Sequence, residues 1–401
     1  MNERQALLNR WVDIAVEMLV SGAEIYRVED TLRRLARAYT AVSADVFVIT
    51  SLIVLTAGFE GDESYTVTRR LRAVTGMDMD KLEKLNELSR YACRKTPDSA
   101  ELAERLSAIS CAAPRKWEIL LGSTLAAGAF ALFFGGTLTD GALAVLFGLV
   151  IWAVLLLLGK LGFNRLMQYL ISSIATGLLI CLAGQIPALH MHIAKVIVGV
   201  IMLPIPGLAI TNSLRDMLVG DTISGFMRFV QSLLEALALA GGFTFAIYLS
   251  GAQVDYLPVQ DGVKQLIPAL LGAAGFALMF NSRMRYLWTH ALGALVVWAV
   301  YIYAELRLGL DVFWCSLIAA MCATLLSELC ARTLKAPVTL FLIPFLVPLV
   351  PGSGLFYACS ALIARGMSTY AAQTLFAVCG ISLGTGLAAS LVSVLSKRSR
   401  T

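Results

Sequence analysis

Charged residues are scarce in this sequence. Only 15% of the 401 residues are Asp, Glu, Lys or Arg, whereas 58% are hydrophobic. Soluble globular domains carry about a quarter charged residues, so this composition excludes an ordinary soluble protein. We therefore predict that most of the chain lies in a lipid bilayer.

Several motifs that carry chemistry are also missing. The eight cysteines form no CxxC pair and mostly lie within apolar runs, which favours small buried hydrophobic side chains over disulfides or metal ligands. The sequence contains no Gly-rich phosphate loop, no metal-spaced His/Cys cluster and no nucleophile elbow. We expect no catalytic residues, no cofactor, no metal and no ATP coupling within this chain, and hence no enzyme.

No secretory signal is visible, because the chain begins with the charged segment MNERQALLNRWVD and its first long apolar run follows Trp117. The N-terminus is expected to stay in the cytoplasm. Residues 1–114 hold 15 of the 32 Lys/Arg and 17 of the 27 Asp/Glu, so the rest of the chain carries the whole positive excess on short loops. This excess indicates membrane topology rather than nucleic-acid binding.

Ten apolar runs are long enough to cross a bilayer about 30 Å thick. They lie near residues 117–135, 141–158, 167–184, 194–212, 226–250, 266–281, 286–304, 312–331, 337–363 and 371–395. With the N-terminus inside, thirteen Lys/Arg fall on cytoplasmic loops, against Lys264, Arg307 and Arg365 outside and an ambiguous Lys195. The prediction is a multi-pass protein of the bacterial cytoplasmic (inner) membrane with both termini in the cytoplasm.

A repeat of 145 residues relates the first five runs to the last five. Pro206-Gly207 then corresponds to Pro351-Gly352, and Gly148 to Gly293. Because five is an odd number, the second copy would be inverted relative to the first, as in many secondary transporters.

The predicted fold class is mainly α, with ten transmembrane helices in two inverted five-helix repeats and an N-terminal cytoplasmic α+β domain. The predicted parts are that domain at 1–114, the first membrane repeat at 115–250, an outer linker at 251–263, the second repeat at 264–396 and a cytoplasmic tail at 397–401. In the N-terminal domain, apolar periodicity predicts helices at 4–19, 26–39, 79–94 and 98–111, and β-branched runs at 46–56 and 65–71 predict a hairpin.

Two of the apolar runs are interrupted by proline and glycine at corresponding places. The prolines remove backbone donors and the glycines tolerate open backbone, so both helices should unwind and expose groups able to bind substrate. Simple packing kinks are the alternative. The predicted binding residues are Pro204, Pro206, Gly207, Thr211 and Asn212 in the first half, and Pro348, Pro351, Gly352 and Gly354 in the second.

Three acids are candidates for coupling transport to protons. Glu235 lies roughly 13 Å into the fifth run, where an unpaired carboxylate costs about 2.5 kcal/mol or more, and a static pair with Arg228 is the alternative. Asp216 is equally well explained as a membrane-edge charge. Glu328 has Arg332 at i+4, which favours a structural ion pair.

Five motifs together resemble the threonine/serine exporter family over nearly the whole chain. SGAEIYRVED at 21–30 is similar to its cytoplasmic domain and NSLRDMLVGDTISGFMR at 212–228 to its membrane half. FNSRMR at 280–285, SELCARTLKAP at 327–337 and LVPLVPG at 346–352 are similar to its smaller partner subunit. Some members divide these halves between two proteins, of which one pair is associated with succinate export, and this chain resembles the fused form.

The resemblance implies a secondary exporter of threonine, serine or a related small acid, driven by the proton gradient or membrane potential. Within the first motif, Glu24, Arg27 and Glu29 would serve gating or docking, with a solvated charged face as the alternative. The expected partners are a small polar substrate (an amino acid or a dicarboxylate), protons and membrane lipid, without nucleic acid, and a homo-oligomer remains open. A channel and an integral-membrane enzyme are the competing functions.

Overall fold

The computed structural model describes residues 3–61, 63–71, 76–252, 262–363 and 369–398. Its contacts divide the chain into two compact units. The first comprises Met1–Lys116 together with the tetrapeptide Phe280–Arg283, and the second comprises the remaining residues. Each unit is described separately below.

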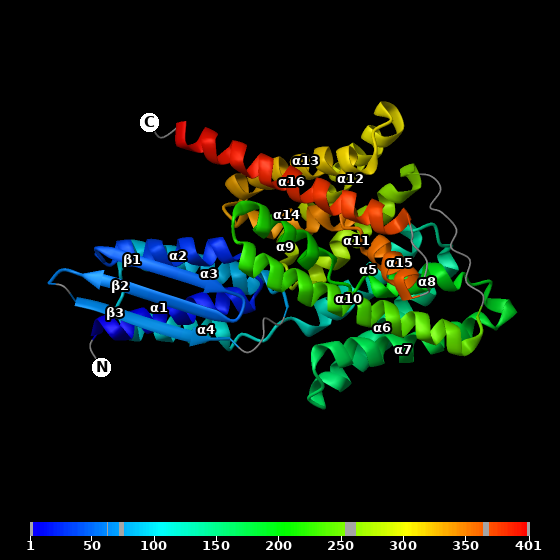
Figure 1. The fold of residues 1–401 in the computed structure, drawn as a ribbon, viewed down its shortest axis with the longest axis horizontal. Coiled ribbons are helices and arrows are strands. Elements are labelled where there is room, and N and C mark those ends of the chain that lie inside the picture. Colours follow the sequence, from blue (N-terminus) through cyan, green and yellow to red (C-terminus); the bar gives the residue numbers. More distant parts are fainter. Residues whose placement is uncertain (1–2, 62, 72–75, 253–261, 364–368, 399–401) are drawn as a thin grey trace. The chain divides into compact units, whose positions relative to one another are not determined.

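The first unit is an α+β structure with a three-stranded antiparallel sheet in the order β1-β2-β3 (Figure 1). Its elements are α1 (Glu3–Val20), α2 (Ile25–Ala38), β1 (Ser43–Ile49), β2 (Leu52–Phe59), β3 (Glu63–Arg70), α3 (Met79–Lys95) and α4 (Ser99–Ser110). The four predicted helices are confirmed. The predicted hairpin is confirmed as the antiparallel pair β2-β3, but a turn at Thr50 and Ser51 divides its first β-branched run into two strands, β1 and β2.

The core of this unit lies between the apolar faces of its helices and the apolar face of its sheet. Alternate residues of β2 are buried, and α1 contributes a stripe that includes Trp11, whose ring lies 5.1 Å from that of Tyr39. Trp11 is fully buried, and burial of a large apolar side chain stabilises a fold by about 1.5–3 kcal/mol. The hydrophobic pattern therefore accounts for how these helices cover the sheet.

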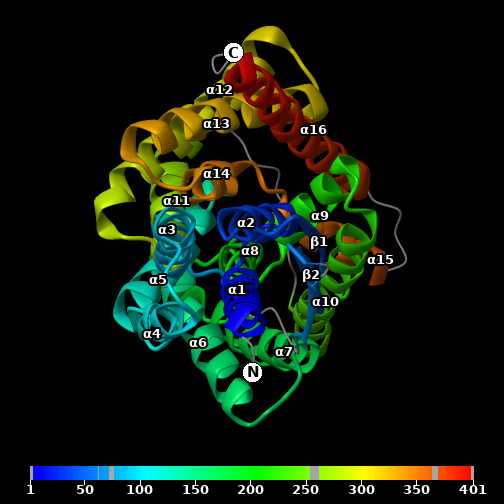
Figure 2. The ribbon, with the colours of Figure 1, turned by 90° about the vertical axis from the view of Figure 1, so that its left-hand side faces the viewer.

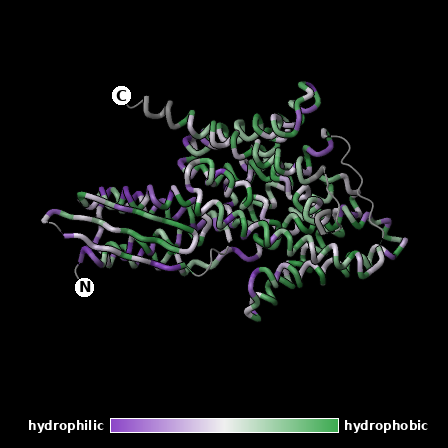
Figure 3. Tube along the Cα trace, viewed as in Figure 1, coloured by the Kyte–Doolittle hydropathy of each residue, from purple (hydrophilic) through white to green (hydrophobic). Residues whose placement is uncertain are grey.

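All regular elements of the second unit are helices in the part of the chain that the structure describes. Its α-helices are α5 (Lys116–Phe133), α6 (Leu138–Lys160), α7 (Arg165–Gly184), α8 (Ile193–Ile201), α9 (Gly207–Val219), α10 (Thr222–Ser250), α11 (Leu266–Met279), α12 (Leu287–Leu308), α13 (Val312–Leu334), α14 (Val338–Leu346), α15 (Gly352–Ile363) and α16 (Thr369–Arg398). Short 3-10 helices lie at Pro187–Leu189, Gly262–Gln265, Met284–Tyr286 and Val347–Leu349. Most of this unit is hydrophobic along its helices, whereas the helices of the first unit carry many hydrophilic positions (Figure 3).

Among the described residues, eight helices are long and apolar enough to cross a membrane, and the bent pair formed by α14 and α15 raises this number to nine. The chain is therefore a multi-pass membrane protein. The predicted count of ten is not confirmed, because the fourth apolar run forms the short helices α8 and α9 with an open segment from 202 to 206. A nine-residue helix is about 13.5 Å long, less than half a bilayer core.

Element boundaries in the two halves follow the 145-residue spacing closely. The bounds of α14 coincide with those of α8 after this shift, and α15 begins at the position that corresponds to the start of α9. The neighbours also correspond, because α7 packs beside α10 and α13 beside α16 (Figures 1 and 2). Furthermore, α9 contacts α16 while α15 contacts α10, so each half-helix packs on the last helix of the other half.

Candidate functional site

The first break separates α8 from α9 in the region predicted from proline and glycine. Pro204 and Pro206 have no N–H to donate, and Pro206 immediately precedes the first residue of α9, Gly207. The Ile205 amide still donates to the Ile201 carbonyl at 3.1 Å, and the Gly207 amide donates to the Ile205 carbonyl at 2.9 Å. The chain therefore turns tightly here instead of continuing as one helix.

The second break lies between α14 and α15. The 3-10 helix Val347–Leu349 contains Pro348, and Pro351 precedes α15, so the two helices meet with a bend of 50°. Pro344 lies inside α14 without ending it. Both breaks consequently place the N-terminus of a half-helix, whose first backbone amides have no partner within the helix, in the interior of the unit.

The two breaks pack against each other. A Cβ built on Gly207 would overlap the side chain of Val350, and one built on Gly352 would lie 2.5 Å from the sulfur of Met202 and 3.1 Å from Ile205. Each glycine thus permits a close approach that a larger residue would block. The structure brings the two predicted sets of break residues together at these contacts.

Hydrogen bonds join the half-helices to the long helices of the opposite half. Ser382 on α16 donates to the carbonyl of Thr211 on α9 at 3.1 Å, and Thr244 on α10 donates to Ser360 on α15 at 3.1 Å. Thr211 is buried and its hydroxyl donates to the Gly207 carbonyl, whereas Asn212 is half-buried. These bonds link α9 to α16 and α15 to α10.

A cavity of about 500 Å³ opens beside the second break. It is lined by Phe133, Phe134, Gly262, Gln265, Trp298, Tyr301, Glu305, Leu306, Val312, Ser316, Pro348, Leu349, Val350, Pro351, Ser353, Gly354, Tyr357, Gln373, Thr374 and Ala377. Of the predicted binding residues, Pro348, Pro351 and Gly354 contribute to this lining. Those of the first break do not, so the cavity is formed mainly by the second half.

Glu305 is the charged residue among those that line the cavity, and sequence analysis overlooked it. It lies in the last turn of α12, four residues after Tyr301, whose ring stacks on that of Trp298 with centroids 4.6 Å apart. An acid at the end of an apolar helix resembles an ordinary boundary charge in sequence. Only the fold shows that this one faces a cavity together with the N-terminal residues of α15.

Glu235 is buried and paired with a residue that the sequence did not indicate. Its carboxylate lies 3.4 Å from Nε of Arg165 on α7 and accepts a hydrogen bond from Gln231 at 3.1 Å. The same Nε donates to the hydroxyl of Tyr169 at 3.0 Å. The suggested pair with Arg228 is therefore wrong, because Arg228 lies 3.5 Å from Asp216 instead.

The other acidic residues considered in this unit form ion pairs or cap a helix. Asp216 is buried on α9 and its partner Arg228 lies on α10, so this pair joins two successive helices. Glu328 forms an ion pair with Arg332 at 2.8 Å, as the i+4 spacing indicates. Asp140, which sequence analysis did not select, is fully buried, forms the capping box of α6 with the N-cap residue Thr137, and accepts a hydrogen bond from the amide of His192.

In the first unit, the predicted gating residues lie on or beside α2. Glu24 precedes the helix and is only 7% exposed, so a solvated face is the wrong interpretation for this acid. Glu29 accepts a hydrogen bond from the amide of Val48 at 3.1 Å and pairs with Arg33, which ties α2 to strand β1. Arg27 is half-buried on the same helix.

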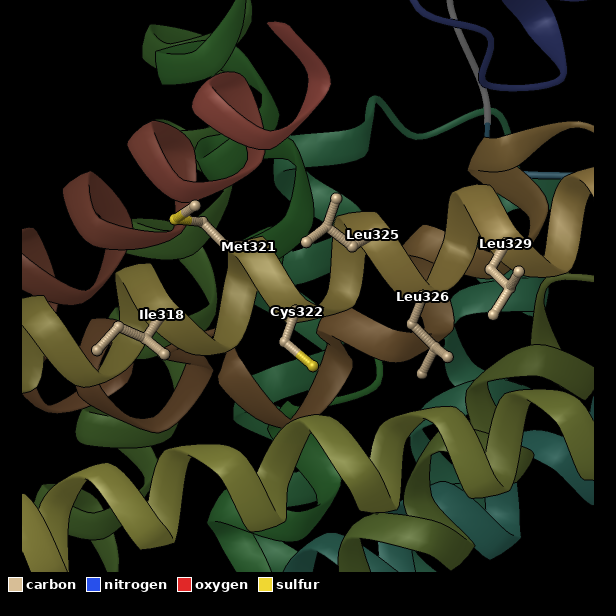
Figure 4. A pocket seen from close by; sticks show the side chains of 6 residues that line it. All are labelled: Ile318, Met321, Cys322, Leu325, Leu326 and Leu329. Carbon is tan, nitrogen blue, oxygen red and sulfur yellow. The ribbon is translucent and has the colours of Figure 1, made fainter. Parts of the chain in front are cut away.

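An apolar groove of about 600 Å³ runs along α13 and is distinct from the cavity (Figure 4). It is lined by Ile318, Met321, Cys322, Leu325, Leu326 and Leu329. These side chains offer no strong hydrogen-bonding group to orient a polar molecule. The groove is suited to hydrocarbon, as expected of a helix that faces lipid.

Comparison with known proteins gives matches over both halves. A family model described as a threonine/serine exporter matches residues 11–250, and a second, described as "Threonine/Serine exporter, ThrE", matches residues 265–392. A protein of Klebsiella aerogenes named "Probable succinate transporter subunit YjjP" is 25% identical over 250 residues, which cover 62% of this chain and 96% of that protein. No solved structure matches the chain.

Proposed function

Since this chain belongs to the threonine/serine exporter family, we propose that it is a secondary active exporter of small zwitterionic amino acids, with threonine and serine as substrates. The observation that carries the proposal is the cavity beside the second break. It combines an acidic side chain with the N-terminus of a half-helix.

The charges around the cavity favour an amino acid over a dicarboxylate. Glu305 can attract an ammonium group, and the first turn of α15, where Ser353 and Gly354 line the cavity, can attract a carboxylate through its free amides. Among the described lining residues there is no Lys, Arg or His to balance the second carboxylate of a dicarboxylate. Succinate remains the second candidate, because the Klebsiella protein is named for it.

Transport would proceed by movement of the two membrane halves about the paired breaks. Two observations support a pair of repeats that surround the site. The element boundaries correspond after the 145-residue shift, and α9 contacts α16 while α15 contacts α10. We also propose that the second repeat is inverted relative to the first. Export would be driven by the proton gradient or membrane potential, with Glu235 as the group that gains and loses the proton.

Export by living cells tests this function directly. Cells with and without the protein are loaded with dipeptides that release threonine, serine or other amino acids, and parallel cells are loaded with succinate. The protein should lower intracellular threonine and serine several-fold while leaving succinate unchanged. Loss of succinate alone would replace the proposed substrate with the second candidate, and no change in either would reject export.

Replacing Glu305 with glutamine is expected to raise the KM for threonine and serine about tenfold. Removal of the charge weakens attraction to the ammonium group, and a tenfold change corresponds to about 1.4 kcal/mol. Initial export rates over a range of internal substrate concentrations would measure it. Glu328→Gln is the matched control, because Glu328 pairs with Arg332 on α13 and does not line the cavity. Equal KM values in the two variants and the parent would show that Glu305 does not bind the substrate.

A topology of ten spans with both termini in the cytoplasm and residue 255 outside remains our proposal, and it predicts which positions are accessible from outside. A single cysteine at position 255, in a variant lacking the eight native cysteines, should react in intact cells with an impermeant thiol reagent, whereas one at position 398 should react only after the membrane is opened. Asp255 lies outside the described residues. Labelling of position 398 but not 255 in intact cells would reverse the assignment of the inner and outer faces. Labelling of neither position, or of both, would contradict ten spans.

A further inference from the structure

The tetrapeptide Phe280–Arg283 belongs to the compact first unit, although it follows α11 in the chain. It lies within the second family match, at 265–392, whereas the rest of the unit lies within or close to the first match, at 11–250. More than 160 residues of sequence thus separate the tetrapeptide from the rest of this unit. Specific contacts hold the tetrapeptide in this unit.

The first contacts are made at the N-terminus of α3, where backbone amides lack helical partners. The amide of Met79 donates to the Phe280 carbonyl at 2.9 Å. Nδ2 of Asn281 donates at 2.8 Å to the Asp78 carboxylate, which also caps the helix by accepting from the amide of Lys81. Asn281 has φ +56°, a left-handed conformation that asparagine adopts more readily than most residues.

Arg283 adds ion pairs to the contact between the tetrapeptide and α3. Its Nε lies 2.6 Å from the carboxylate of Asp80 and 3.3 Å from that of Glu83, which is only 3% exposed. Burial tends to raise the pKa of Asp80, but hydrogen bonds from Arg283 and Lys84 outweigh it and hold this pKa below its ordinary value. The acidic first turn of α3 and the basic tetrapeptide are therefore electrostatically complementary.

Arg115 also binds the tetrapeptide, through its backbone carbonyls. Its Nη2 donates to the carbonyls of Asn281 at 3.4 Å and Ser282 at 3.1 Å. Asn281 and Ser282 are 5% and 1% exposed. The tetrapeptide is thus enclosed on several sides by residues of the N-terminal sequence.

We propose that the N-terminal end of α3, with its cap residue Asp78 and with Asp80 and Glu83 in its first two turns, is a recognition site for an Asn-Ser-Arg loop and holds it without help from chain connectivity. In this protein the loop comes from its own second half. A relative that comprises only the first half would present the same turn to a second polypeptide carrying such a loop. The inference does not depend on the identity of the substrate.

The test cuts the full-length protein after it has folded. A protease site is inserted at 111–113, three exposed residues between α4 and α5. The purified protein is immobilised through a C-terminal tag and then cut, so that an N-terminal fragment that is no longer held can leave. The parent fragment should stay bound after cleavage. Arg283→Glu and Asp80→Arg should each speed its release at least tenfold, and combining Asp80→Arg with Arg283→Asp should restore retention substantially.

Controls separate recognition from misfolding. Arg285→Glu changes a nearby arginine outside the tetrapeptide and should leave release unchanged, and Arg283→Gln tests charge with little loss of volume. Each variant is compared with the parent by gel filtration before cleavage. Release of the parent fragment on cutting would overturn the proposal, as would retention by both single charge reversals at the parent level.

Discussion

Gly207→Leu and Gly352→Leu are each expected to reduce export of threonine and serine at least tenfold. A Cβ at Gly207 would overlap Val350, and one at Gly352 would crowd Met202 and Ile205, so either leucine forces the paired breaks apart. Leucine also favours regular helix over open backbone by roughly 1 kcal/mol relative to glycine. The measurement is the export rate normalised to the amount of folded protein in the membrane.

The choice of control glycine matters for this experiment. Gly148 corresponds to Gly293 in the repeat and lies in an unbroken helix, but a Cβ there would stand 3.0 Å from that of Ala127. It therefore mediates close helix packing and is an unsuitable control. Gly386 on α16 has no neighbouring atom within 4 Å of an added Cβ, so Gly386→Leu should transport like the parent. If all three leucine variants transport equally well, the breaks are simple kinks.

Glu235→Gln is expected to abolish gradient-driven export while leaving exchange of substrate across the membrane within about twofold of the parent. The carboxylate is buried beside Arg165, and a buried membrane acid requires pairing or protonation. Glutamine keeps the size but cannot carry the proton. Arg165 would still donate to Tyr169 and is 43% exposed, so the change should not leave an isolated buried charge.

Glu328→Gln provides the comparison for Glu235, since it also removes an acid from an arginine pair within a membrane helix. Its gradient-driven export should remain near the parent rate. Normal pumping by Glu235→Gln would show that the pair with Arg165 is structural. Loss of both pumping and exchange would instead assign Glu235 to substrate binding or folding.

The sequence predicted the features that depend on local chemistry. Proline and glycine located both breaks, because proline has no amide to donate and glycine tolerates open backbone, and the i+4 spacing identified the partner of Glu328. Contacts across the fold were not accessible in this way. Arg165 lies seventy residues before Glu235, and nothing local shows that α7 packs beside α10. Glu305 was overlooked for the same reason, and the motif at 280–285 was identified without its contacts to α3.

Efflux from proteoliposomes tests the central claim of gradient-driven amino-acid export most directly. Vesicles containing the purified protein are loaded with labelled threonine, serine or succinate, and efflux is measured with and without an imposed proton gradient or membrane potential. The account predicts that threonine and serine leave several-fold faster when the gradient is imposed, that a protonophore removes a proton-driven acceleration, and that succinate remains inside. Efflux of succinate alone, or amino-acid efflux that neither gradient changes, would contradict it.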